Sequence, residues 1–223
     1  MIKIYDRVEQ GSEEWHSLRC GILTASEVKL ILTEKTLKPS NNDKTRSHVY
    51  EIAGQRITNY TEPSYINDDM IRGMRDEIYA LELYSKKYEP VKEVGFITND
   101  KLGFTLGYSP DGIVGDFGLV ECKSRLQKHQ LKTIANNEVP SDYMLQLQAG
   151  LLISERQWID FISYCGGMPM FVKRVYPIVE YQQAIIEASI NFEFKVGDVI
   201  NDYNTNSAQF YNTERVEEGL DII

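Results

Sequence analysis

The spacing of apolar residues in the first part of the chain predicts helices. Between Asp68 and Lys87 an apolar residue recurs every three or four positions, which is the period of one helix face. Two further helix starts are marked by capping residues. Ser12, followed by two glutamates, is typical of an N-cap with an acidic first turn. The segment 24–27, Thr-Ala-Ser-Glu, fits a capping box.

The pattern changes to that of strands in the middle of the chain. Apolar and polar residues alternate through 94–108. Turn sequences follow at 109–112 (Ser-Pro-Asp-Gly) and at 116–118 (Asp-Phe-Gly). The short apolar segments beside them, 113–114 and 119–123, are therefore predicted to pair as a hairpin.

The remainder of the chain returns to helices and longer strands. We expect a helix at 141–154, strands at 158–164 and 171–176, a closing helix at 178–192, and an irregular polar tail from Asn201. The order of these elements predicts an α/β (α+β) fold with a central mixed β-sheet flanked by helices.

Length and composition fit one globular domain. The chain has 223 residues, of which 42% are hydrophobic and 26% charged. No repeat or linker divides it, so we expect one domain over 1–223, with N-terminal helices at 1–60, a core at 68–165 and a C-terminal strand, helix and tail at 166–223. No apolar run approaches the roughly 20 residues of a membrane span. Three scattered cysteines favour a reducing compartment such as the cytoplasm.

The net charge of −9 limits the ways in which the protein could bind nucleic acid. It argues against passive, charge-driven binding of DNA or RNA over a broad surface. It does not exclude an enzyme that grips phosphates locally and holds cations with clustered carboxylates. The three histidines lack metal-ligand spacing and are expected at the surface or in caps. Both tryptophans, Trp15 and Trp158, are expected as core aromatics.

The candidate chemistry lies in the predicted hairpin. Side chains alternate along a strand, so Glu121 and Lys123 project from one face and Cys122 from the other. An acid and an amine on a strand built for burial require pairing or a metal. Asp111 lies at the turn end of the neighbouring strand and can be brought beside Glu121, which would give a Mg²⁺ site. The alternative is a common Asp-Gly turn and the wet face of an edge strand, with Glu77 a solvated helix charge.

The set of motifs resembles a known superfamily. Gly-x-x-x-Glu at 73–77, Ser-Pro-Asp-Gly at 109–112 and Glu-x-Lys at 121–123 resemble the PD-(D/E)XK nucleases, which have a restriction-endonuclease-like core. The segments at 10–19 and 23–27 are similar to the N-terminal signature of the lambda exonuclease and YqaJ-type viral recombinase family. Residues 143–148 resemble its later glutamine motif and 158–164 its following strand. The similarity covers residues 9–165 with matching order and spacing.

The resemblance implies a DNA exonuclease that degrades one strand of a duplex from its 5′ end and leaves 3′ single-stranded overhangs for phage-type recombination. It implies Mg²⁺, with Mn²⁺ as a substitute, held by Glu77, Asp111, Glu121 and the backbone carbonyl of Cys122. Lys123 would orient the attacking water or help to deprotonate it. The residues carried over to contact a phosphate at the DNA end are Arg19, Ser26, Ser109 and Gln146. Asp100 would correspond to a further acidic residue near the site of the family, if the loop in this chain is one residue longer than in the family.

Partners and location are also carried over from the resemblance. It implies double-stranded DNA ends as the substrate, a homo-oligomer in the form of a trimeric ring, and a single-strand annealing protein as partner. A phage or prophage protein of this kind would act in the cytoplasm of a bacterial host and would not bind a membrane.

The chain departs from the family in two places. The family continues its Glu-x-Lys with Cys-Pro, where this chain has Ser124 and Arg125. No match is evident after Phe171. The basic positions from the strand onward are Lys123, Arg125, Lys128 and Lys132. They are candidates for a DNA path, or for a solvated helix face.

Two alternatives keep the same residues. One is a RecB-like nuclease that acts on single strands or as an endonuclease. Its iron–sulfur members need four cysteines, and this chain has three scattered ones. The other is a DNA-end-binding module with an inactive site, although a decayed site would have little reason to keep buried charges.

Overall fold

The structure is a computed structural model that describes residues 1–63 and 67–215. Its helices are α1 (Glu13–Arg19), α2 (Val28–Ile31), α3 (Asp43–Thr58), α4 (Asp68–Lys87), α5 (Gln127–Asn136), α6 (Met144–Ser154) and α7 (Val179–Ser207), with short 3₁₀ helices η1 (Ala25–Glu27) and η2 (Ser141–Tyr143). Within those residues no helix has the length and apolar character required to cross a membrane.

The strands form two four-stranded mixed sheets and a short ribbon. One sheet has the order β1 (Ile2–Tyr5), β5 (Phe96–Asn99), β6 (Leu106–Tyr108) and β2 (Leu23–Thr24). The other has the order β10 (Phe171–Val175), β9 (Trp158–Tyr164), β8 (Gly118–Ser124) and β7 (Gly112–Val114). The ribbon pairs β3 (Leu32–Thr33) with β4 (Lys38–Pro39). The α/β class with mixed sheet pairing is confirmed, with the strands divided between two sheets.

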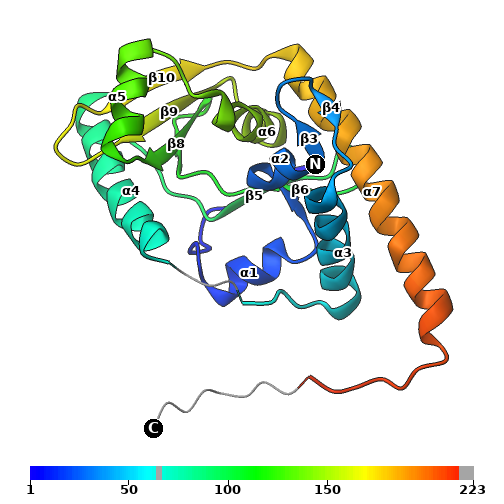
Figure 1. The fold of residues 1–223 in the computed structure, drawn as a ribbon. Helices are drawn as coiled ribbons and strands as arrows, with labels where there is room; N and C mark the ends of the chain where they lie inside the picture. The colour runs from blue at the N-terminus through cyan, green and yellow to red at the C-terminus, as the bar shows by residue number, and fades with distance from the viewer. Residues whose placement is uncertain (64–66, 216–223) are drawn as a thin grey trace, which may run out of the picture.

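Strand β8 is central because both of its faces are covered. It pairs parallel with β9 and antiparallel with β7, so the expected hairpin is present. Val120 and Cys122 face the buried side chains of α4, whereas Leu119 belongs to the larger core that includes α6. Figure 1 shows α4 and α6 on either side of β8 and β9. The residues between Val120 and Ser124 are thereby held between two helices.

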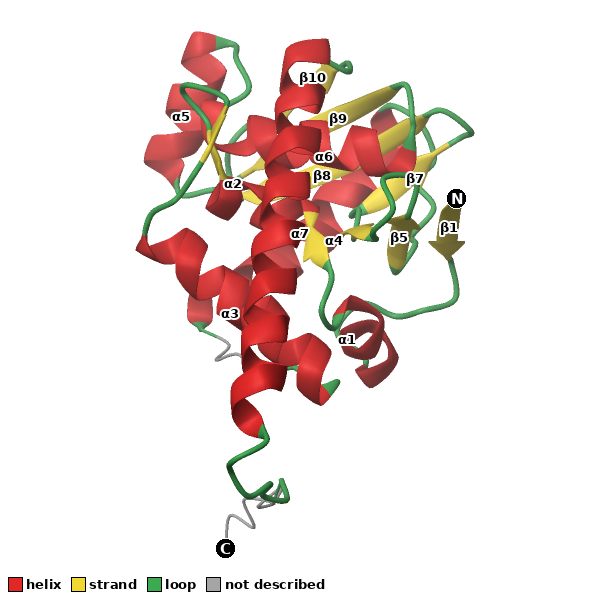
Figure 2. Ribbon diagram, turned by 90° about the vertical axis from the view of Figure 1, so that its right-hand side faces the viewer, coloured by secondary structure: helices red, strands yellow, loops and turns green. Residues whose placement is uncertain are grey.

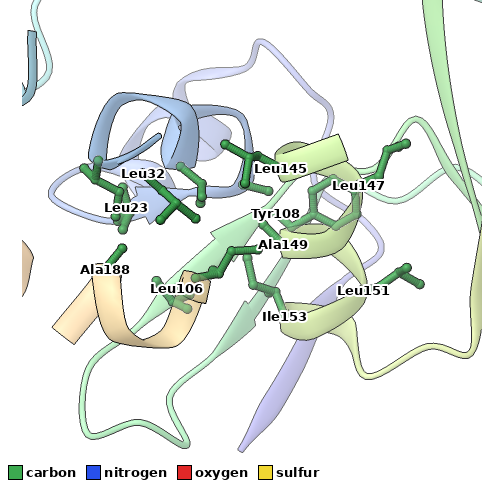
Figure 3. Close-up of a cluster of buried hydrophobic side chains, with 14 of the residues drawn as sticks. Leu23, Leu32, Leu106, Tyr108, Leu145, Leu147, Ala149, Leu151, Ile153 and Ala188 are labelled. Atoms are coloured by element: carbon green, nitrogen blue, oxygen red, sulfur yellow. The ribbon is translucent and has the colours of Figure 1, made fainter. Parts of the chain in front are cut away.

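The larger core is built around α6, whose sequence is apolar nearly all round. A helix of that kind has no face for solvent and is buried. Figure 3 shows its side chains packing against Leu106 and Tyr108 of β6 and against Leu23 and Leu32 of the N-terminal region. The same core includes Ala188 of α7. Residues from the beginning, middle and end of the chain therefore share one interior.

The closing helix is longer than the sequence predicts. The expected end near residue 192 is wrong, because α7 continues to Ser207 and includes the start of the tail expected to be irregular from Asn201. Helix α7 packs against α3 and α6, and Phe192 and Val196 are both buried. The buried face of the helix therefore continues past the predicted end. Figure 2 shows α7 running down one face of the molecule. The last part of that tail, 216–223, lies outside the described residues.

His48 is not at the surface. The expectation holds for His16 and His129, which are exposed, but the His48 side chain is only 2% exposed. Its ring stacks on Phe192 with centroids 5.3 Å apart, and its Nδ1 lies 3.1 Å from Glu51 Oε2. The packing of α3 against α7 buries it, and nothing local in the sequence marks that contact.

Candidate functional site

Glu121 is the centre of the candidate site. Its side chain is buried on the α6 face of β8 and accepts three hydrogen bonds. Tyr108 Oη donates to Oε2 at 2.7 Å, while Lys123 Nζ and Gln146 Nε2 donate to Oε1 at 2.7 and 2.5 Å. A carboxylate held by three donors is fixed in position.

Asp111 is brought to Glu121 by the hairpin. It directly precedes β7, and Gly112 pairs with Val120 across the ladder. Asp111 Oδ2 accepts the backbone N–H of Cys122 at 2.5 Å, which anchors the turn to the strand that carries Glu121. Burial raises the pKa of Asp111 well above its usual range, and the nearby charges of Glu121 and Glu77 raise it further. The carboxylates are thus close enough to repel one another.

Glu77 reaches the same place from α4. It lines a cleft of about 700 Å³ together with Asp111 and Glu93. Burial raises the pKa of Glu77 to about 7, with a further contribution from the charge of Glu121. The solvated-charge interpretation of Glu77 does not describe this position. A carboxyl that titrates near neutral pH beside two others is typical of a functional site.

Lys123 and Cys122 have different surroundings although they are neighbours. Burial lowers the pKa of the Lys123 ammonium, but the charges of Glu121 and Asp111 outweigh burial and leave that pKa above its ordinary value. Lys123 is therefore a cation in this state and a donor rather than a base. The Cys122 thiol is buried towards α4, and burial raises its pKa far enough to keep it protonated. The thiol is no nucleophile here.

The donors of this cluster fit a hard cation by their chemistry. Mg²⁺ prefers oxygen ligands and is commonly bound through one or two carboxylates with several waters. Asp111 and Glu121, the Cys122 carbonyl and the nearby Glu77 are oxygen ligands of that kind, and their mutual repulsion would be relieved by a positive charge. Among residues 1–63 and 67–215 no three acidic, histidine or cysteine side chains are already spaced to hold a metal ion. Binding would therefore require side-chain adjustment.

A second group of polar residues gathers around Ser109. The Ser109 hydroxyl accepts hydrogen bonds from Trp15 Nε1 at 3.0 Å and Arg19 Nη1 at 3.2 Å. The Arg19 guanidinium lies over the Trp15 ring, 4.2 Å from its centroid. Burial lowers the pKa of Arg19, and Glu27 partly offsets that effect. The core role expected for Trp15 is thus wrong in part, because its indole N–H serves this polar group.

Strand pairing relates the remaining predicted residues to these two groups. Strands β2 and β6 are parallel, and Thr24 pairs with Gly107. Ser26 on η1 follows β2 and Ser109 follows β6, so both lie at the same end of this strand pair. Ser26 Oγ lies 3.3 Å from Thr24 Oγ1. Gln146 of α6 binds Glu121. Asp100 is not brought to the site, because it follows Asn99 at the opposite end of the β5–β6 pair and contacts the N-terminal amine.

The structure gives roles to three residues to which the sequence analysis assigned none. Tyr108 holds Glu121, and Gln10 Nε2 donates to the carbonyl oxygens of Pro110 and Val94 at 2.8 and 3.2 Å, which fixes the loop before Asp111. Tyr143 contacts Arg125. A tyrosine in a buried strand needs a partner for its hydroxyl, so Tyr108 carried a signal. Gln10 and Tyr143 begin the family-like segments 10–19 and 143–148, but nothing in the sequence indicates these contacts.

Comparisons with known proteins give a family match and similar solved structures. A family model described as YqaJ-like viral recombinase domain matches residues 14–157. Two structures of LHK-Exo, an alkaline exonuclease from Laribacter hongkongensis, are similar. They share 27% and 28% identity with this chain at TM-scores of 0.72 and 0.73, and the second is a complex with dAMP. In each case 87% of this chain and 99% of that chain are covered.

A more distant structure shares the fold. It is a phage related exonuclease from Haemophilus somnus 129PT, with 12% identity, a TM-score of 0.59, and coverage of 81% of this chain and 96% of that one. The comparison with curated proteins gives no match.

Proposed function

The chain belongs to the YqaJ-like viral recombinase domain family, and from this premise we propose that it is a Mg²⁺-dependent exonuclease. It degrades one strand of linear double-stranded DNA from the 5′ end and leaves 3′ single-stranded overhangs. The exonuclease names of the similar structures support the reaction class, and the dAMP complex of LHK-Exo supports a nucleotide ligand. The strand polarity and the metal are part of the proposal.

One observation carries this proposal. Glu121 is buried on β8 and the partly buried Lys123 lies 2.7 Å from it, while Asp111 is tied to the intervening Cys122. Burying acids and an amine at one point is unfavourable unless they pair or bind a metal. One ammonium does not neutralise Glu121, Asp111 and Glu77, so the cluster favours a further cation. Phosphodiester hydrolysis needs oxygen ligands for a cation and a positive group beside the water and phosphate.

The residues divide into two roles. Asp111, Glu121, the Cys122 carbonyl and Glu77 would hold Mg²⁺, which supplies Lewis-acid activation and lowers the pKa of a bound water. The Lys123 ammonium orients the water and the scissile phosphate and stabilises developing negative charge. Arg19, Ser26 and Ser109, with Gln146, would bind the terminal phosphate of the DNA. Arg19 already donates to Ser109, so its guanidinium is held in place.

The decisive experiment compares linear and covalently closed circular duplexes with Mg²⁺ present. We expect complete degradation of one strand of the linear duplex, with label released first from the 5′ end, and no loss of the circle. Mn²⁺ should replace Mg²⁺, and chelator should stop the reaction. Release of label from the 3′ end first would refute the polarity.

The alternatives give other results in the same assay. Cleavage of the closed circle would favour a RecB-like endonuclease, and selective digestion of single strands its exonuclease form. Binding of ends without any cleavage would favour the inactive module. The pairing of Lys123 with the buried Glu121 speaks against that module.

Assembly and location complete the proposal. We propose a homotrimeric ring around DNA and a single-strand annealing protein that receives the overhang, both by family resemblance. The setting is the cytoplasm of a bacterial host, with the gene carried by a phage or prophage.

A further inference from the structure

Arg125 continues the catalytic face of β8. It stands two residues after Lys123, and its backbone N–H donates to the Tyr164 carbonyl at 2.7 Å, which extends the parallel pairing with β9 by one position. Its place along the chain is therefore fixed by the sheet. The family resemblance has proline at this position, so the residue is a feature of this chain.

The Arg125 side chain lies against Tyr143 beside Lys123. Its guanidinium carbon is 5.1 Å from the centre of the Tyr143 ring, and Nη1 donates to the Tyr143 hydroxyl. Lys123 Nζ lies 5.7 Å from the centre of the same ring. Tyr143 directly precedes α6, which carries Gln146 one turn later. The aromatic ring thus holds both cations at one side of the carboxylate cluster.

Arg125 is a cation without an anionic partner. In the part of the chain that the structure describes, no carboxylate lies within ion-pair distance of it, whereas Lys123 has Glu121. Arg174, by comparison, is paired with Asp160 at 2.8 Å. The Arg125 Nε is buried and has no hydrogen-bond partner. A partly buried guanidinium with an unsatisfied N–H is unfavourable, and an anion bound to the guanidinium would compensate its buried charge.

We propose that Arg125 binds a phosphodiester group of the degraded strand next to the scissile phosphate. The proposal rests on the proposed nuclease function for the identity of the ligand. The planar guanidinium matches a phosphate with two parallel N–H donors, and Tyr143 restricts its orientation. Lys123 faces the reacting phosphate, so a neighbouring cation on the same strand face meets the adjoining linkage. Arg125 is a substrate-binding residue and does not take part in bond cleavage.

The test uses the full-length protein and 5′-phosphorylated duplexes with a single methylphosphonate, which removes one phosphate charge, at successive linkages from the 5′ end. Binding is measured by fluorescence anisotropy in chelator, and cleavage under single-turnover conditions with Mg²⁺. For the wild type we expect one linkage near the scissile bond at which the substitution weakens binding by about 10-fold, the effect of one charge-assisted contact. Arg125→Gln should show that loss already with the unmodified duplex and no further loss at that linkage.

The control is Lys44→Gln, which removes the same charge from an exposed position on α3 and should reproduce the wild-type profile. If Arg125→Gln melts early, Arg125→Lys is used, with a reduced penalty expected at the same linkage. A variant that binds as tightly as wild type, or keeps the wild-type penalty at every linkage, overturns the inference. Wild-type protein that binds ends but cleaves nothing refutes the proposed activity alone. Wild-type protein that binds no duplex end refutes both.

Discussion

At the scale of single residues, Lys123 separates chemistry from DNA binding. Lys123→Ala should reduce cleavage below detection while the protein stays folded and still binds DNA ends. The reason is that Lys123 acts on the water and scissile phosphate, whereas affinity comes from several phosphate contacts. Tyr108 and Gln146 still hold Glu121 in the variant. Cleavage assays and end binding on the same preparation measure both effects, and wild-type cleavage would remove Lys123 from the mechanism.

Arg19 tests the reading of the DNA end. Arg19→Ala should slow digestion of a 5′-phosphorylated duplex by about 10-fold or more, because a charge-assisted bond to phosphate is worth roughly 1.5–3 kcal/mol. Digestion of a 5′-hydroxyl duplex should change little. Rates for the two duplexes give the comparison. An equal loss on both would mean that Arg19 only stabilises the pocket through Trp15 and Ser109.

The raised pKa of Glu77 predicts how stability and Mg²⁺ affinity depend on pH. Its pKa of about 7 lies above the ordinary value of 4.5, so between these values the folded metal-free protein binds more protons than the unfolded chain. The free energy of unfolding should therefore fall as the pH rises through that window, while Mg²⁺ affinity rises with ionisation of the carboxyl. Denaturant titration and calorimetry measure the two trends. In Glu77→Gln both should be flatter, and an unchanged Mg²⁺ profile would exclude Glu77 as the titrating group.

At the scale of elements, local patterns predicted those parts that local forces determine. The bounds of α4 and β9 coincide with the predicted 68–87 and 158–164, because apolar period and turn residues specify them. The face of β8 that carries Glu121 and Lys123 followed from strand alternation. Strand β1 was missed, because its four residues are largely exposed and its pairing with β5 joins segments about ninety residues apart.

Contacts between elements explain what the sequence could not predict in the site. Tyr108 and Glu121 lie on strands of different sheets, and the short connection from β6 to β7 together with the packing of α6 brings them together. The same holds for Gln146, whose expected phosphate contact is a hydrogen bond to Glu121 in this structure. The motifs allowed the candidate site residues to be inferred from the sequence. The hydrogen-bond donors of each carboxylate could not be inferred, because they depend on tertiary packing.

Gly118 tests the packing at the start of β8. A Cβ at this position would lie 2.2 Å from atoms of the Trp158 ring on the adjacent strand. Gly118→Ala should therefore lower the free energy of unfolding by about 1–3 kcal/mol, as is typical of overpacking. Gly166→Ala is the matched control, because a Cβ there meets nothing within 4 Å. Urea titration measures both, and equal stabilities would show that Trp158 moves aside without penalty.

At the scale of the whole molecule, exposed apolar side chains bear on assembly. Ile71 and Ile78 of α4 are 55% and 60% exposed, and Phe194 of α7 is 72% exposed. Large exposed apolar groups are favourable at contacts between copies. For the proposed trimer, light scattering after gel filtration should give about three times the chain mass of 25.7 kDa. The single-chain mass at every concentration would contradict the ring and leave the site residues unaffected.

The three donors on Glu121 have a kinetic consequence. Its Oε1 already accepts bonds from Lys123 and Gln146, so this oxygen must release one of them before it can coordinate a cation. The neutral amide of Gln146 gives up less than the ammonium of Lys123, and once released it is free to donate to DNA. The ion is thus expected to enter faster before the nucleic acid binds than afterwards, which gives a preferred order of addition. Protein mixed first with DNA and then with Mg²⁺ should show a lag, which preincubation with the ion removes.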